Sequence, residues 1–216
     1  MTNQNLIHVL VLGDSGAGKT TLIQKMTNGS DEETTSSAHI DKYPIQIQYN
    51  GIEYVLELID TAGQDKFRTT NKQYFHQTNI YIFLIDVEQL DYYLLNPNEK
   101  DGVSFYLEAA LEMNDTSFLP FFVINKIDLL QDDDEKLSQL KEELFNRIHA
   151  ILKHQLGPQD PQDIWGISCT CRINTNELFP YIEDQSAEYH LKHPMSTSTV
   201  QLEENNKKDP KNHECC

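Results

Sequence analysis

The chain has 216 residues and is strongly acidic, with 34 Asp and Glu residues against 17 Lys and Arg residues and a formal net charge of -17. With 38% hydrophobic residues at this length, it can bury one sizeable core, so we expect a single domain followed by a tail. The negative charge disfavours general electrostatic binding of nucleic acid or anionic lipid head groups, so a bound phosphate must be held by a local site.

Membrane-spanning and disulfide-rich classes are also disfavoured. No apolar run approaches the ~20 residues that a membrane-spanning helix needs, and the first residues lack the basic segment and cleavage site of a secretion signal. We therefore expect a cytoplasmic protein. Its four cysteines, Cys169, Cys171, Cys215 and Cys216, are too few and too clustered for a disulfide framework and lack the spacing of zinc sites, which predicts reduced thiols.

The first part of the chain combines strand and helix patterns. The apolar run 6–12 predicts a buried strand, and a helical pattern begins near Lys19 after a glycine-rich turn. Two alternating segments, 43–49 and 54–60, flank Asn50-Gly51. Because this pair tolerates positive φ, it predicts the turn of a β-hairpin.

Two further apolar runs, 80–86 and 120–128, predict buried strands that end in polar residues, where an open α/β sheet carries its chemistry. Helical spacing predicts one helix between these strands and a longer one after them. Their expected buried faces are Val103, Leu107, Ala110 and Leu111, then Leu137, Leu140, Leu144, Ile148, Ile151 and Leu152.

The acidic run 132–135 favours the start of the longer helix, because the N-terminal end of a helix is electropositive. Residues 164–170 predict a last strand, and a last helix is expected from about 177 to 192. The polar segment that follows has little to bury and predicts a disordered tail. We therefore expect one domain over residues 1–192 and a tail over 193–216.

The glycine-rich turn after the first strand fits the phosphate-binding pattern G-x-x-x-x-G-K-[ST]. It consists of Gly13, Asp14, Ser15, Gly16, Ala17, Gly18, Lys19 and Thr20. Its backbone N–H groups can surround the α- and β-phosphates, Lys19 can reach the β and γ oxygens, and Thr20 can supply a hydroxyl to Mg²⁺. An ordinary glycine turn before a helix explains the glycines but not Lys19 and Thr20 together. The segment therefore predicts a nucleotide site.

A second motif, D-T-A-G-Q, ends the strand 54–60. Asp60 can hold the Mg²⁺ shell, Gly63 can offer its N–H to a γ-phosphate, and Gln64 can position the attacking water. Alone, the motif is an ordinary turn signal. After a phosphate-binding loop, it indicates a site that hydrolyses the γ-phosphate.

The third motif, N-K-I-D at 125–128, indicates the base. A carboxylate at Asp128 can accept hydrogen bonds from two adjacent donors, which guanine presents and adenine does not. The alternative is a polar strand-to-helix loop in which Asp128 caps a helix. Ser168, Cys169 and Thr170 follow the last predicted strand and can present a backbone N–H to the carbonyl oxygen of the base, although small residues after a strand are also common in turns.

The ordered set GDSGAGKT, DTAGQ, NKID and SCT resembles the Ras-like small GTPases from Leu6 to about Lys192. The resemblance implies the P-loop NTPase fold of small G proteins, an α/β fold with a six-stranded, mostly parallel sheet, one antiparallel edge, and helices on both faces. It also implies bound Mg²⁺, slow hydrolysis of GTP to GDP, and a switch between a GTP form that recruits effectors and a GDP form that does not.

The same resemblance assigns roles residue by residue. Gln64 becomes the catalytic residue, and Thr20 and Asp60 become ligands of Mg²⁺. The nucleotide is then held by Gly13, Asp14, Ser15, Gly16, Ala17, Gly18, Lys19, Thr20, Thr21, Asp60, Gly63, Asn125, Lys126, Asp128, Ser168, Cys169 and Thr170.

Within this superfamily, GDSGAGKT, DTAGQDKFRT, the aromatic pair Tyr74-Phe75 and the pair Cys215-Cys216 look most like the Rab branch. That likeness implies geranylgeranylation of both cysteines, attachment to the cytoplasmic face of an endomembrane, and a role in vesicle traffic. His213 lies fourth from the end, so the segment is not a C-a-a-X signal. The implied partners are an exchange factor, an activating protein, effectors, a prenyl transferase and a dissociation inhibitor.

The chain departs from the family pattern at several points. The family's Mg²⁺-binding threonine in switch I aligns with Ala38, and the hydroxyls of Thr34, Thr35, Ser36 and Ser37 precede it. We take Thr35 and Ser37 as metal-ligand candidates, and the choice between them stays open. Ile59 replaces a usual tryptophan, Thr170 replaces a typical lysine, and the segments 87–102 and 154–163 are longer than the family pattern needs.

Two other functions stay open. The segment SCTC faintly resembles the corresponding motif of Arf-like and heterotrimeric G proteins, which keeps another Ras-like signalling protein as an alternative. A scaffold that binds guanine nucleotide but scarcely hydrolyses it is the second. A small-molecule kinase built on a P-loop is disfavoured by the NKID motif.

Overall fold

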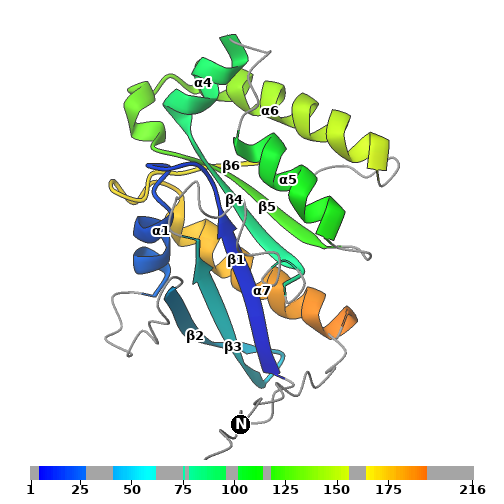
Figure 1. Ribbon diagram of the computed structural model, residues 1–216. Coiled ribbons are helices and arrows are strands. Elements are labelled where there is room, and N and C mark those ends of the chain that lie inside the picture. Colours follow the sequence, from blue (N-terminus) through cyan, green and yellow to red (C-terminus); the bar gives the residue numbers. More distant parts are fainter. Residues whose placement is uncertain are drawn as a thin grey trace, which may run out of the picture.

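A six-stranded sheet forms the centre of the protein, with its strands in the order β2-β3-β1-β4-β5-β6 (Figure 1). The computed structural model describes residues 5–27, 41–61, 75, 78–95, 102–113, 118–155 and 164–193. β2 pairs with β3 in the antiparallel direction, and the remaining neighbours in the sheet pair in parallel. The predicted α/β fold with one antiparallel edge is therefore confirmed.

The elements follow one another along the chain as strands and helices. The strands are β1 Leu6–Leu12, β2 Asp41–Tyr49, β3 Ile52–Asp60, β4 Ile80–Asp86, β5 Leu119–Asn125 and β6 Ile164–Gly166. The helices are α1 Lys19–Met26, α4 Val87–Leu95, α5 Gly102–Met113, α6 Asp134–Gln155 and α7 Thr175–Lys192, and a short 3-10 helix, η2, spans Ile127–Leu130.

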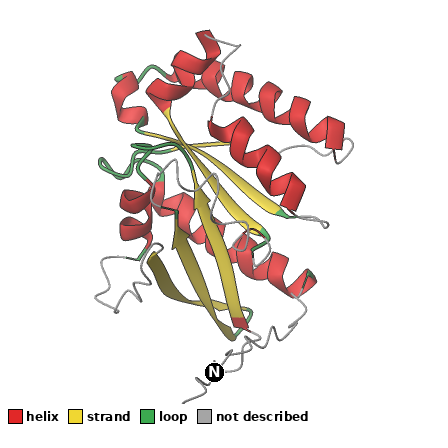
Figure 2. Ribbon diagram, viewed as in Figure 1, coloured by secondary structure: helices red, strands yellow, loops and turns green. Residues whose placement is uncertain are grey.

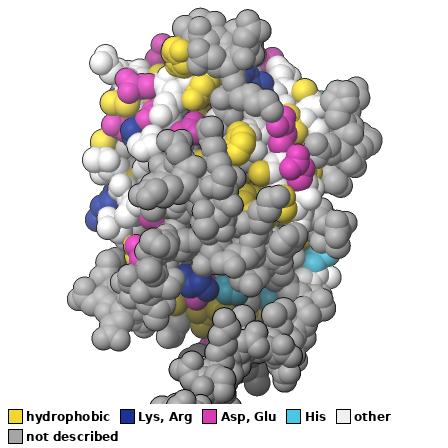
Figure 3. Space-filling view, in the orientation of Figure 1, with side chains coloured by type: hydrophobic (Ala, Val, Ile, Leu, Met, Phe, Trp, Pro, Cys, Tyr) yellow, Lys and Arg dark blue, Asp and Glu magenta, His cyan; other side chains and the backbone are white. Residues whose placement is uncertain are grey.

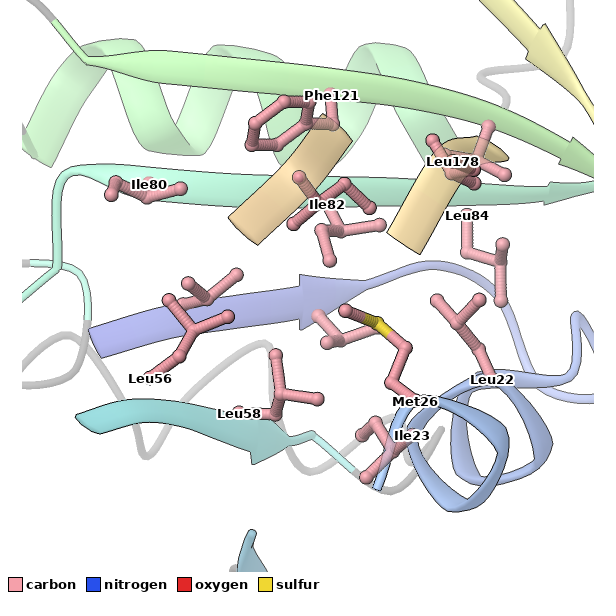
Figure 4. Close-up of a cluster of buried hydrophobic side chains, with 14 of the residues drawn as sticks. Leu22, Ile23, Met26, Leu56, Leu58, Ile80, Ile82, Leu84, Phe121 and Leu178 are labelled. Atoms are coloured by element: carbon pink, nitrogen blue, oxygen red, sulfur yellow. The ribbon is translucent and has the colours of Figure 1, made fainter. Parts of the chain in front are cut away.

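Helices cover both faces of the sheet, and each face has its own hydrophobic core (Figure 2). Helices α1 and α7 pack on one face, where their apolar side chains meet those of β1, β3, β4 and β5 (Figure 4). Helices α4, α5 and α6 pack on the other. β1 and β4 are buried nearly throughout, as expected for central parallel strands covered on both sides.

Several local predictions are confirmed. Asn50 and Gly51 both have positive φ and connect β2 to β3 as a hairpin. The predicted buried face of α5 is present, with Val103, Leu107 and Ala110 buried. The acidic run starts α6, where the Asp133 carboxylate accepts the N–H of Lys136 at 2.9 Å and so caps the helix.

Several elements differ from the sequence prediction. The run 120–128 was predicted as one strand, but β5 ends at Asn125 and Ile127–Leu130 form η2. Helix α4 was not predicted; it begins directly after β4, because the Asp86 carboxylate accepts the N–H of Glu88 at 2.9 Å and caps the first turn. The predicted strand 164–170 was too long: β6 ends at Gly166. The chain then turns back, so that Ser168 and Ile173 exchange backbone hydrogen bonds of 3.1 Å.

On the face drawn in Figure 3, acidic side chains are spread among hydrophobic and polar ones, and the visible Lys and Arg side chains do not gather into one continuous patch. Among the helices that the structure describes, none combines the length with the apolar composition that crossing a bilayer requires. The predicted tail beyond residue 193 lies outside the described residues.

Candidate functional site

The predicted site residues lie where strands end at one edge of the sheet. Residues 13–18 connect β1 to α1, Asp60 is the last residue of β3, and Asn125 is the last residue of β5. Because these strands run in parallel, their carboxyl ends share one edge. Hydrogen bonds described below join these segments, so the edge forms one site.

The glycine-rich loop is shaped by a close contact with the base motif. Gly18 has φ +95°, and a Cβ atom there would lie 2.5 Å from Nδ2 of Asn125. The same Nδ2 donates a hydrogen bond to the carbonyl oxygen of Ala17 at 2.9 Å. Glycine is therefore required at position 18 for both its backbone conformation and its missing side chain. α1 begins at the next residue, with Lys19, Thr20 and Thr21 in its first turn.

Lys19 is 4% exposed, and its ammonium lies over the loop. Its Nζ donates hydrogen bonds to the carbonyl oxygens of Gly13 and Asp14, both at 2.8 Å. Burial lowers the pKa of Lys19, and the negative charges of Asp60 and Asp14 partly oppose this effect. A phosphate bound in the loop would give this buried cation an additional counter-charge.

Thr20 and Asp60 form the pair that fits a metal. The hydroxyl of Thr20 donates to Oδ2 of Asp60 at 2.7 Å, and both oxygens are hard ligands of the kind that Mg²⁺ prefers. Thr61 fixes the end of β3, because its hydroxyl donates to the carbonyl oxygen of Val11 at 2.8 Å. Nowhere in the described ranges do three or more His, Cys, Asp or Glu side chains gather as a metal cluster. An Mg²⁺ ion here would complete its shell with phosphate and water oxygens, as this ion commonly does.

Within the described residues, the base motif presents an acceptor without a hydrogen-bond partner. Oδ1 of Asp128 is buried, and no hydrogen-bond partner for it lies in the described part of the chain. An isolated buried acceptor of this kind is costly, and two adjacent N–H donors of a guanine base would satisfy it. The alternative role of Asp128 as a helix cap is not seen, because η2 is preceded by Lys126 and has no side-chain cap.

Asn125 connects the base motif to the two other loops. Besides donating to Ala17, its Oδ1 accepts the backbone N–H of Cys169 at 3.2 Å. The side chain is 2% exposed. It therefore holds the phosphate loop and the segment after β6 at fixed positions on either side of β5.

The segment 168–170 is held by hydrogen bonds to Ile173 and Asn125. The N–H of Ser168 donates to the carbonyl of Ile173, and that of Cys169 donates to Asn125. This leaves the N–H of Thr170 as the candidate donor to a base carbonyl. The Ser168 hydroxyl accepts the N–H of Cys171 at 3.0 Å. Burial raises the pKa of the Cys169 thiol to about 12, an effect that the charge of Lys25 partly opposes, so this thiol is protonated at neutral pH.

Some predicted residues lie outside the described part of the chain: Gly63 and Gln64, and the switch I candidates Thr35 and Ser37. The sequence analysis missed one residue of the site, Asp86. Its Oδ2 pairs with the ammonium of Lys126 at 2.6 Å. The available signal was a carboxylate at the end of a buried strand, on the edge that carries the other motifs.

Comparison with known proteins places the chain among Ras-related sequences. The family model described as "Ras family" matches residues 8–152. Ras-related protein RABC2b of Arabidopsis thaliana is 25% identical over 179 residues, which cover 83% of this chain and 84% of that protein. Ras-related protein Rab-26 of Mus musculus is 28% identical over 139 residues, which cover 61% of this chain and 51% of that protein. Ras-like protein rasW of Dictyostelium discoideum is 27% identical over 135 residues, which cover 62% of this chain and 58% of that protein. The chain thus spans only about half the length of Rab-26.

Proposed function

Because the chain belongs to the Ras family, we propose that it is a GTPase that binds GTP with Mg²⁺ and hydrolyses it slowly to GDP. The observation that carries the proposal is the buried Oδ1 of Asp128, which has no hydrogen-bond partner among the described residues and lies on the same sheet edge as Lys19 and Thr20. This acceptor fits guanine, and the loop around Lys19 fits the phosphates.

Each group has a separate task in the proposed reaction. Asp128 and the N–H of Thr170 select the base, while the loop 13–18 and Lys19 hold the phosphates. Thr20 and Asp60 would hold Mg²⁺, which would supply positive charge to offset that of the phosphates. Gln64 orients the attacking water, and Gly63 donates its N–H to the γ-phosphate. In the GTP form, one of Thr35 and Ser37 would supply a further oxygen ligand to Mg²⁺.

Hydrolysis is tested by single-turnover kinetics with and without Mg²⁺. Gln64→Leu should retain nucleotide binding and slow hydrolysis by roughly a hundredfold, because water orientation contributes mainly to the transition state. Gln48→Leu makes the same chemical change at an exposed position of β2 and serves as the matched control. A parent protein that binds GTP and hydrolyses none, or a Gln64→Leu variant with the parent rate, would favour a nucleotide-binding scaffold.

We further propose a Rab-like switch that works in vesicle traffic at the cytoplasmic face of an endomembrane. Support comes from the likeness to RABC2b across most of both chains. Lipids on Cys215 and Cys216 would provide the attachment. A single lipid chain binds membrane only marginally, and the lysines of the segment 201–214 are offset by acidic residues, so two lipids are needed. Its partners would be an exchange factor, an activating protein, effectors, a prenyl transferase and a dissociation inhibitor.

Intact-mass measurement of the protein from its own cells tests the attachment. Two geranylgeranyl groups are expected, and replacement of both cysteines by serine should move the protein from the membrane fraction to the cytosol. Unmodified thiols on membrane-bound protein would contradict the lipid proposal while leaving the GTPase proposal intact.

A further inference from the structure

Helix α4 contacts two of the nucleotide-binding segments. It lies between β4 and α5, at the edge of the sheet that carries the site (Figure 1). Its Gln89 side chain donates to the carbonyl oxygen of Ser15 in the phosphate loop at 3.3 Å. At the start of α5, a Cβ atom on Gly102 would lie 2.2 Å from Oδ1 of Asp14, so the loop also packs closely against the next helix.

The other side of α4 is fixed to α6. Asp91 pairs with Lys136, and Nη2 of Arg147 donates to the carbonyl oxygen of Tyr93 at 2.7 Å. Leu90 of α4 is buried in the same core as Leu140 and Leu144 of α6. α4 is therefore held between a long, packed helix and the loops of the candidate site.

Asp86 joins α4 to the base motif through one carboxylate. It is 5% exposed. Its Oδ1 caps the first turn of α4 by accepting the N–H of Glu88, and its Oδ2 pairs with the ammonium of Lys126 at 2.6 Å. Lys126 has φ +65°, a conformation that is unfavourable for a residue with a side chain, and it lies two residues before Asp128.

The ion pair fixes a strained residue next to the base-reading carboxylate. Removing the charge of Asp86 would leave the Lys126 ammonium without its counter-ion and would release the constraint on this turn. Removing this charge should affect the part of the site that binds the base, because Asp86 has no contact with Thr20 or Asp60 in the described hydrogen bonds.

We propose that Asp86 is a positioning residue for the guanine nucleotide: by holding Lys126, it sets the rate at which GDP leaves. This inference rests on the proposed function, since it requires a guanine nucleotide at Asp128.

The test is the release rate of a fluorescent GDP analogue from the full chain with Mg²⁺. Asp86→Asn removes the charge but keeps a side chain that caps helices equally well. Release should accelerate by about tenfold, the effect of losing one charge-assisted contact. Asp91→Asn is the matched control, because it makes the same change at a carboxylate that pairs with a lysine of α6 and not with the base motif. It should change release by less than about twofold.

A double-mutant cycle shows whether Asp86 acts through Lys126. In a Lys126→Gln background, Asp86→Asn should cause no further acceleration, since the partner charge is already gone. Equal acceleration in both backgrounds would overturn the inference, because a merely structural role of Asp86 would not depend on Lys126. If Asp86→Asn fails to fold by circular dichroism, Asp86→Ser, a smaller capping residue, replaces it in the same cycle.

The outcomes separate the two proposals. A parent protein that binds no GDP analogue defeats the proposed function. A parent that binds it, together with variants that release it at the parent rate, defeats only the role of Asp86.

Discussion

Asn125 shows how one buried side chain can organise a site made of distant segments. Its amide spans from Ala17 in the phosphate loop to Cys169 after β6. Buried amides are stable only when their polar atoms are paired, so these two contacts hold both loops in register with β5. The same side chain leaves no room for a Cβ at position 18.

Asp128 is the residue that we expect to select guanine. Asp128→Asn should weaken binding of GTP by a few kcal/mol, because an amide cannot accept from both donors of guanine. Binding of xanthosine triphosphate should improve, since its 2-oxygen accepts a hydrogen bond from the amide. Equilibrium binding of both nucleotides measures the change.

The control for this prediction is Asp132→Asn. Asp132 is exposed and has φ +63°, a conformation that asparagine adopts as readily as aspartate. Its substitution should leave both affinities unchanged. Unaltered GTP affinity in Asp128→Asn would show that this carboxylate does not read the base.

At the scale of elements, β1, β2 and β3 share a charged cluster on one face of the sheet. Glu57 of β3 lies 2.8 Å from Nδ1 of His8 and 2.7 Å from Nζ of Lys42. Burial alone would raise the pKa of Glu57, but hydrogen bonds and charge from His8 and Lys42 outweigh it and lower the pKa to about 2. The ionised carboxylate therefore helps to hold the three strands together.

This cluster predicts a pH-dependent stability. The folded pKa of Glu57 is depressed from 4.5 to about 2, so its contribution is complete above pH 4.5 and is lost as the pH falls toward 2. Glu57→Gln should lower the free energy of unfolding by about 1–3 kcal/mol at pH 7 and by much less near pH 2.5. Urea unfolding at both pH values measures this difference.

Glu53→Gln provides the comparison, because Glu53 lies on the same strand but is exposed. Its effect should be small at either pH. If Glu57→Gln lowered the free energy of unfolding equally at both pH values, the Glu57 side chain would contribute through packing and not through its charge.

Most elements could be predicted because their patterns are local. Apolar runs marked β1, β4 and β5, alternation marked β2 and β3, and helical spacing marked α5 and α6. α4 escaped prediction because it follows β4 without an intervening turn residue, and its cap, Asp86, also ends the strand. The length of β6 depends on the two backbone hydrogen bonds between Ser168 and Ile173. This pairing is a tertiary arrangement and not a sequence pattern.

At the scale of the whole molecule, the candidate site joins segments from most of the sheet. The motifs around Lys19, Asp60 and Asp128 were recognisable because each is a short run with a required order of residues. The contacts between them were not predictable. Asp86 and Lys126 are 40 residues apart, and Asn125 and Ala17 are 108 apart, so only the fold brings each pair together.

Because the site ties these segments together, its ligand should stabilise the entire domain. GDP with Mg²⁺ should raise the melting temperature, because a ligand that binds only the folded state stabilises it. At 100 times its Kd, such a ligand adds about 2.7 kcal/mol to the free energy of unfolding. Removing both with a chelator and a desalting step should reverse the rise. ADP with Mg²⁺ is the control in a thermal-shift measurement, and an equal rise with ADP would contradict guanine selection.

The central position of β1 also has a consequence for biosynthesis. β1 is made first, but its two neighbours in the sheet are encoded later, with Leu6 opposite Val55 and Leu10 opposite Tyr81. The β2–β3 hairpin can close from local contacts as soon as it has been synthesised, whereas β1 waits for partners distant in the chain. The phosphate loop is synthesised long before Asn125, yet it acquires its final shape only after Asn125 has left the ribosome. During translation, the apolar strand β1 therefore has unsatisfied edges until β4, which ends at Asp86, has been synthesised, a state in which a chaperone would be of most use.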